Sequence, residues 1–184
     1  RNLKILRKKF PEIPIIALTA TATEKVRDDI IKQLNLKNPK IFLSSFNRPN
    51  LSYEILPKKD SLKSIIAILN DYQNESVIIY CFSRNNTETM VNNLNKYGFK
   101  AAAYHAGLKS EQRKENQERF IRDEINIMVA TIAFGMGIDK PDVRLVIHHS
   151  LPKSIEGYYQ ETGRAGRDGL PARCILFFSY ADKF

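Results

Sequence analysis

The sequence predicts an α/β fold, a parallel sheet flanked by helices on both faces, and three observations lead to it. From about residue 60 onward, apolar runs of strand length alternate with segments of helical spacing. The run Ser76–Phe82 is almost continuously apolar, as expected for a strand buried on both faces. Of the 184 residues, 43% are hydrophobic and 27% are charged, which favours a packed core over a disordered chain. Ligand sites are expected at the carboxyl ends of such strands.

The first 46 residues are expected to form a separate, incomplete unit. Its predicted elements are the end of a basic helix within residues 1–10, a strand over Ile13–Leu18, a helix that begins after Thr23, and a short strand over Ile41–Leu43. These elements are too few to enclose a core. Residues 45–50 are typical of a linker, because Pro49 interrupts regular structure. The sequence therefore predicts one complete domain over residues 47–184.

Helices and strands of this domain follow from apolar spacing and capping residues. A helix begins at Asp60 or Ser61, and a second helix follows the first strand and ends at Gly98, because glycine is common just after a helix. The remaining predicted elements are strands over Lys100–Tyr104, Asn126–Thr131, Arg144–His149 and Ala172–Phe178, and helices over Ser110–Arg122 and from Ser154 to about Ala165.

Charge and cysteine content exclude several classes of protein. The 29 basic and 20 acidic residues give a net charge of +9, of which +6 lies in residues 1–46. A basic surface suits nucleic acid, but many solvated surfaces are equally basic, so charge alone does not decide. Cys81 and Cys174 lie in apolar runs and are expected to be reduced core thiols. The chain shows neither a run of about 18 apolar residues nor a secretory signal, so it is expected to be neither membrane-bound nor secreted.

Two common kinds of site are not predicted in this sequence. None of the eight glycines begins the GxxxxGK[ST] pattern of a phosphate-binding loop. The three histidines do not combine with the cysteines at the spacing of a metal site, so no metal site is expected within the chain.

Polar residues gather at predicted strand ends in three places. Small residues and hydroxyls fill Ala17–Thr23, Ser83 and Arg84 follow the first buried strand, and Val129–Arg144 places Thr131 at a strand end before a glycine-containing loop with Asp139. A helix that starts at a strand end suits a bound phosphate. Each segment is equally consistent with an ordinary polar turn.

A fourth cluster, Tyr158–Gly169, is more informative. Gln160, Arg164 and Arg167 are spaced four and three residues apart, so they share one stripe if the helix continues through the glycines. Two guanidinium groups that face the same way match the charge of a phosphoryl group in transfer. The alternative is a solvated basic turn in which Asp168 is an ion-pair partner.

Taken together, these clusters resemble the motifs of the superfamily-2 helicases, and their residue sequences resemble those of the RecQ DNA helicases. Ala17–Thr23 resembles motif III and Tyr80–Arg84 motif IV, and Tyr104–Leu108 resembles the DNA-facing segment that follows. Val129–Arg144 resembles motif V and Tyr158–Gly169 motif VI. DEAD-box RNA helicases usually open motif VI with His-Arg, and the Gln160-Glu161 found here favours RecQ.

The resemblance implies a RecA-like fold and a role for each matching residue. In this family two RecA-like domains bind ATP with Mg²⁺ in the cleft between them and move 3′ to 5′ along DNA. Arg167 is then the arginine finger, Arg164 contacts the γ-phosphate, Gln160 organises the interface and Asp139 lies near the ribose. Thr19 and Thr21 couple the two domains. The residues that match DNA-facing positions are Arg48, Ser83, Arg84, His105, Gly107 and Thr131.

The resemblance also implies what lies outside this sequence. Residues 1–46 match the C-terminal tail of the first RecA-like domain, and residues 47–184 match the helicase C-terminal domain. The P-loop and Asp-Glu box are expected before Arg1, and the zinc-binding and winged-helix parts after Phe184. The fragment alone is therefore expected to be inactive. Expected partners are single-stranded and partly duplex DNA and the preceding RecA-like domain, in the nucleus or the bacterial cytoplasm. The alternatives are a non-catalytic nucleic-acid-binding module and an RNA-directed relative.

Overall fold

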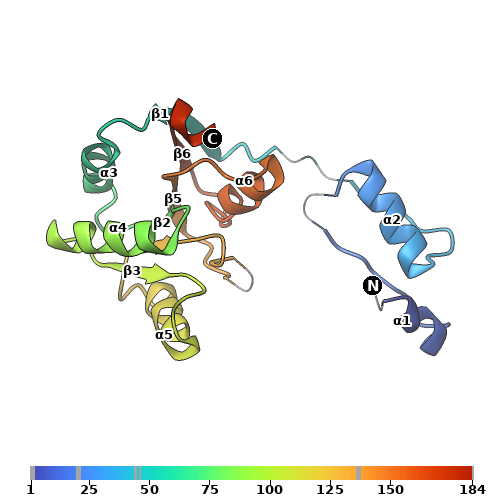
Figure 1. Ribbon diagram of the computed structural model, residues 1–184. Coiled ribbons are helices and arrows are strands. Elements are labelled where there is room, and N and C mark those ends of the chain that lie inside the picture. Colours follow the sequence, from blue (N-terminus) through green and yellow to red (C-terminus); the bar gives the residue numbers. More distant parts are fainter. Residues whose placement is uncertain (1–2, 20–21, 44, 46, 136–137, 184) are drawn as a thin grey trace. The chain divides into compact units, whose positions relative to one another are not determined.

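The computed structural model describes residues 3–19, 22–43, 45, 47–135 and 138–183 of the chain. It divides into two compact units, Arg1–Asn47 and Arg48–Phe184 (Figure 1). In the described part, no helix has the length and apolar character needed to cross a bilayer.

The first unit contains two helices, α1 (Lys4–Lys9) and α2 (Glu24–Leu34). Thr23 precedes α2 in extended conformation, and Asn35 ends it in the left-handed region with φ of 49°. The predicted strands over Ile13–Leu18 and Ile41–Leu43 are wrong, because these residues form no strand. A strand needs a hydrogen-bonded neighbour, and the described residues of this unit supply none.

The second unit is built on a six-stranded sheet with the strand order β1-β6-β5-β2-β4-β3. All five neighbouring pairs are parallel, which confirms the predicted fold class. The strands are β1 (Leu51–Pro57), β2 (Ser76–Tyr80), β3 (Ala101–Tyr104), β4 (Ile127–Ala130), β5 (Val143–His148) and β6 (Ala172–Phe178).

Strand β1 was not predicted from the sequence. It lies at the edge of the sheet and pairs only with β6 among the described strands. Its side chains are mostly exposed or half-buried, whereas every residue of β2 is buried. An edge strand has little apolar patterning, and this one follows directly on the Arg48–Asn50 segment that the sequence marks as a linker.

Helices cover both faces of the sheet (Figure 1). On one face, α3 (Ser61–Asn70) and α4 (Arg84–Lys96) pack against alternate strand residues such as Val77 and Ile79. On the other, Phe120 of α5 (Ser110–Ile121) and Phe134 pack against Ile78 and Tyr80. This division follows from the two-residue period of a strand. Short helices α6 (Ile155–Thr162) and η1 (Tyr180–Lys183) complete the unit.

The predicted helix from Ser154 to about Ala165 ends earlier than expected. Helix α6 stops at Thr162, and residues 163–168 form successive turns. Gly166 adopts φ of +53° and its N–H donates to the Val143 oxygen of β5 at 2.9 Å, so the chain leaves the helical path. The expected continuous stripe of Gln160, Arg164 and Arg167 is therefore wrong.

The two cysteines are buried free thiols, as expected. Burial raises the pKa of both Cys81 and Cys174 to about 12, because a thiolate would lose its hydration there.

Candidate functional site

Five predicted residues come together at one edge of the sheet. Ser83, Arg84, His105, Gly107 and Thr131 follow β2, β3 and β4, which are neighbours in the order β2-β4-β3. We call this set the carboxyl-end cluster. Parallel strands bring their carboxyl ends to the same edge, so residues far apart in sequence meet there.

A pocket opens within the carboxyl-end cluster. Its lining includes Ser83, Arg84 and Thr131. The Ser83 hydroxyl caps α4 by accepting a hydrogen bond from the Asn86 N–H at 3.1 Å. Positive charge beside a helix N-terminus suits an anionic ligand such as a phosphate.

His105 and Gly107 shape this pocket indirectly. The His105 side chain is buried, its Nδ1 accepts the Gly107 N–H at 3.2 Å, and its Nε2 lies 2.7 Å from Oε1 of Glu88. Because Nδ1 accepts, Nε2 is the nitrogen that donates to Glu88. A side chain at Gly107 would place its Cβ only 2.9 Å from Cδ of Arg84. Gly107 therefore leaves the room that the Arg84 side chain occupies.

Sequence reasoning missed two exposed apolar residues of the pocket lining, Phe82 and Ile132. They are 68% and 65% exposed, whereas β2 beside them is fully buried. Phe82 extends the apolar run of β2, so the sequence assigned it to the strand. Its position immediately before the Ser83 cap was the available signal.

The second group lies on the turn that follows α6, residues 163–170, which we call the arginine turn. Arg164 reaches the loop after β4, where a Cβ on Gly135 would lie 2.8 Å from its Nη2. It also lies near Tyr80, whose hydroxyl donates to the Phe134 oxygen at 3.1 Å. Burial raises the pKa of Tyr80, and the positive charge of Arg164 opposes this rise.

Arg167 contacts the same loop after β4. Its Nη1 donates to the main-chain oxygen of Ile138 and to Oδ1 of Asp139, both at 3.0 Å. The Asp139 side chain is 90% exposed. The structure therefore brings Arg164, Arg167 and Asp139 to one loop, and Gln160 lies exposed on the last turns of α6.

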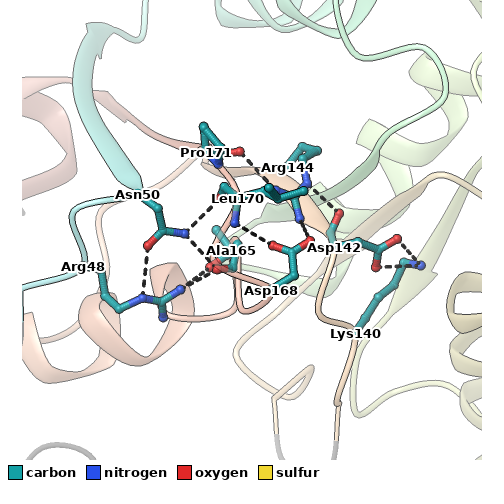
Figure 2. A network of polar contacts seen from close by, with 10 residues as sticks. Arg48, Asn50, Lys140, Asp142, Arg144, Ala165, Asp168, Leu170 and Pro171 are labelled. Carbon is teal, nitrogen blue, oxygen red and sulfur yellow. Dashed lines mark hydrogen bonds and ion pairs between the residues drawn. The ribbon is translucent and has the colours of Figure 1, made fainter.

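Ion pairs hold the two ends of this region (Figure 2). Nη2 of Arg144 on β5 pairs closely with Oδ2 of Asp168. The Arg144 guanidinium lowers the pKa of Asp168. Lys140 is 5% exposed, and its Nζ lies 2.7 Å from Asp123 and 3.2 Å from Asp142. These pairs fix the segment before β5 and the C-terminal part of the arginine turn.

The remaining predicted residues lie elsewhere. Arg48 is not part of the pocket lining, and its guanidinium donates to main-chain oxygens of the arginine turn (Figure 2). Its expected contact with DNA stays a prediction. Thr19 is exposed in the first unit, and Thr21 lies outside the described residues.

The arginine turn carries two guanidinium groups that suit an anionic ligand, and the described residues do not gather a metal site. Nε of Arg164 is buried and has no hydrogen-bond partner among the described residues, and the carboxylate that pairs with Arg167 is open to solvent. Two guanidinium groups with one unsatisfied donor suit an anion. In the described ranges, no three His, Cys, Asp or Glu side chains are grouped so that they could hold a metal ion.

Comparison with known families identifies the class of domain. The helicase conserved C-terminal domain family matches residues 58–169, so the chain belongs to that family.

Individual relatives confirm the resemblance to RecQ helicases. The chain is 54% identical over 186 residues to the RecQ-like DNA helicase BLM of Xenopus laevis, covering 99% of this chain and 14% of that protein. It is 49% identical over 177 residues to the ATP-dependent DNA helicase RecQ of Pasteurella multocida, covering 96% of this chain and 28% of that protein. The chain thus spans less than a third of either relative.

A solved structure confirms the RecA-like fold. The structure of S. cerevisiae Dbp5 bound to RNA and ADP BeF3 aligns with a TM-score of 0.81 at 18% identity, over 99% of this chain and 49% of that one.

Proposed function

We propose that this chain is the second motor domain of an ATP-dependent 3′–5′ DNA helicase of RecQ type. Residues 1–46 are the tail of a first RecA-like domain, and residues 47–184 are the helicase C-terminal domain. The division of the structure at Asn47 and the family match over residues 58–169 support this reading. The partner domain and ATP-binding P-loop belong to the rest of the helicase. The helicase is located where its DNA is, in the nucleus or in the bacterial cytoplasm.

The observation that carries the proposal is the arginine turn with its exposed counter-charge. Arg167 pairs with an Asp139 side chain that is 90% exposed, so the guanidinium can exchange this carboxylate for a phosphate without a large rearrangement. ATP with Mg²⁺ supplies the phosphoryl group that is transferred to water. Arg167 stabilises the negative charge that develops on that group, Arg164 holds the γ-phosphate, and Asp139 is then free to meet the ribose. Gln160 organises the interface.

The carboxyl-end cluster binds the sugar-phosphate backbone of single-stranded DNA in this proposal. Arg84 supplies charge, while Ser83 and Thr131 supply hydroxyl donors beside the N-terminus of α4. Gly107 leaves the room that the Arg84 side chain occupies, and His105 accepts the Gly107 N–H. Thr19 and Thr21 couple the two motor domains.

The test is Arg167→Ala in the complete helicase that carries this sequence. The rate constant kcat of DNA-stimulated ATP hydrolysis should fall by about 10³–10⁵-fold, with ATP and single-stranded DNA affinities kept within about threefold. An unchanged kcat would contradict the motor role and favour a nucleic-acid-binding module. A preference of the complete protein for RNA would favour the RNA-directed alternative. The isolated 184-residue chain should show no DNA-stimulated hydrolysis.

A further inference from the structure

The arginine turn is held by a segment more than 110 residues earlier in the chain (Figure 2). Nη2 of Arg48 donates to the main-chain oxygens of Ala165 at 3.2 Å and Gly166 at 2.7 Å. Nδ2 of Asn50 donates to the oxygens of Gly166 and Leu170, both at 2.8 Å. Nε of Arg48 also contacts Oδ1 of Asn50 at 3.4 Å, so the two side chains support each other. We call this pair the Arg48–Asn50 clamp.

The clamp fixes one particular peptide plane. The Gly166 oxygen accepts hydrogen bonds from both Arg48 and Asn50, and it also accepts the Gly169 N–H at 3.0 Å within the turn. That oxygen belongs to the same planar peptide unit as the Arg167 nitrogen. Fixing the plane therefore fixes the positions of the Arg167 nitrogen and Cα, from which its side chain starts.

The backbone around the clamp leaves little freedom for the turn. The Asn50 main-chain oxygen accepts the Ala172 N–H at 2.9 Å, so Asn50 holds the turn and the start of β6 together. A Cβ on Gly166 would lie 2.6 Å from Nδ2 of Asn50 and 2.7 Å from the Leu170 oxygen. Gly166 is the residue type that allows this approach, and its φ of +53° suits glycine.

We propose that Arg48 and Asn50 are positioning residues that aim Arg167 at the transferring phosphoryl group. The proposal rests on the proposed function, in which Arg167 is the arginine finger. It assigns Arg48 a role through hydrogen bonds to main-chain oxygens, for which the planar fork of a guanidinium is suited and a lysine ammonium is not. A displacement of a catalytic group by about 1 Å is enough to lower a rate by about 100-fold.

The experiment compares single and double variants of the complete helicase. Arg48→Ala and Asn50→Ala should each lower kcat for ATP hydrolysis at saturating DNA by about 10- to 100-fold, with KM for ATP and Kd for single-stranded DNA within about threefold. Arg48→Lys should keep DNA affinity but not restore kcat. In an Arg167→Ala background, Arg48→Ala should change kcat by less than about twofold, because the group it positions is absent.

Arg173→Ala is the matched control. Arg173 makes a comparable bidentate contact, to Glu54 at 3.0 and 2.6 Å, that joins β6 to β1 without touching the arginine turn. Arg173→Ala should keep kcat within about twofold of the unchanged helicase, although its melting temperature should fall about as far as that of Arg48→Ala. If its kcat falls as far as that of Arg48→Ala, the effect is general destabilisation and the proposal is overturned.

Other outcomes separate the clamp from the arginine finger. Losses from Arg48→Ala and Arg167→Ala that multiply in the double variant would overturn the positioning role while leaving the finger intact. A loss confined to DNA affinity, rescued by Arg48→Lys, would assign Arg48 to DNA instead. If Arg167→Ala alone keeps the full kcat, the proposed function fails before the clamp is tested.

Discussion

The carboxyl-end cluster and the arginine turn are held in place by different means. The contact around Gly107 is with the flexible Arg84 side chain, whereas the contacts around Gly166 are with the Leu170 main-chain oxygen and with an Asn50 amide that is itself bonded. Arg84 can shift when its neighbour changes, but the main chain of the arginine turn cannot. We infer that the cluster tolerates adjustment to a ligand, while the turn is preorganised for one geometry.

Adding a methyl group where the turn is tightest should have a large effect on hydrolysis, second only to the loss of Arg167. Gly166→Ala should lower kcat for ATP hydrolysis by about 100-fold in the complete helicase, because the new Cβ would push Asn50 and Leu170 apart and turn Arg167 away. Rates of DNA-stimulated hydrolysis measure this, beside Kd for single-stranded DNA, which should be unchanged.

Gly169→Ala is the control for backbone strain. Gly169 also has a positive φ, +84°, but a Cβ there would meet nothing within 4 Å. Both variants cost about 1–2 kcal/mol for the left-handed conformation, so they differ in the contacts that a Cβ on Gly166 would make with Asn50 and with the Leu170 oxygen. Equal kcat for the two variants would show that strain, and not the clamp, governs the turn.

A charge removed from the carboxyl-end cluster should affect DNA and leave hydrolysis intact. Arg84→Ala should weaken single-stranded DNA binding by about tenfold and reduce the slope of log K against log salt by about 0.7, the value for one phosphate contact. At saturating DNA, kcat should stay within about twofold. Lys63→Ala, which removes an exposed charge from α3, should leave both the DNA affinity and kcat unchanged. A tenfold loss in kcat for Arg84→Ala would contradict the assignment of DNA binding to the carboxyl-end cluster and of hydrolysis to the arginine turn.

Much of the carboxyl-end cluster could be predicted from the sequence because its signals are local. Ser83 and Arg84 directly follow the apolar run of β2, and the parallel order of the strands then brings Thr131 beside them. Arg48 is different. Its partner Gly166 lies 118 residues away, and no periodicity or spacing connects the two. The resemblance placed Arg48 at DNA, and only the folded chain shows its contacts with the turn.

The two false strands and the missed one have a related cause. Ile13–Leu18 and Ile41–Leu43 are rich in the apolar residues that favour a strand, but they have no strand to pair with in the described residues. In contrast, β1 has little apolar patterning, and it forms because it pairs with β6. Composition reports on burial, and pairing decides whether a strand forms.

A smaller effect is expected from adding a methyl group at Gly107. Gly107→Ala should weaken single-stranded DNA binding by about three- to tenfold, because its Cβ would displace the Arg84 side chain, which moves at little cost. Melting temperature should hardly change, in contrast to Gly166→Ala. In an Arg84→Ala background the loss should disappear, since the displaced side chain is gone. Binding titrations of the unchanged helicase, the two single variants and the double variant measure this. If Gly107→Ala lowers DNA affinity by the same factor in the Arg84→Ala background, Gly107 contacts DNA by itself.

The smallest expected effect concerns Asp168, which supports the far end of the arginine turn. Arg144 lowers the pKa of Asp168 below its ordinary value of 3.8. A lowered pKa in the folded state means that the stabilisation is fully present above pH 3.8 and is lost as pH falls through the lower, folded-state value. Asp168→Asn should therefore melt about 1–3 °C below the unchanged chain at pH 7, and the two curves should converge at strongly acidic pH.

Glu54→Gln is the matched control for Asp168→Asn, because Arg173 likewise lowers the pKa of Glu54 away from the turn. Both variants should show the same convergence of melting temperatures. Only Asp168→Asn should also lower kcat, by about twofold. It removes the ion pair with Arg144 that holds residue 168, whose Oδ1 accepts the Leu170 N–H at 3.1 Å and so steadies the residue whose oxygen Asn50 binds. Equal kcat for the two would confine the rigid part of the turn to Gly166 and its clamp, with the Arg144–Asp168 pair contributing stability alone.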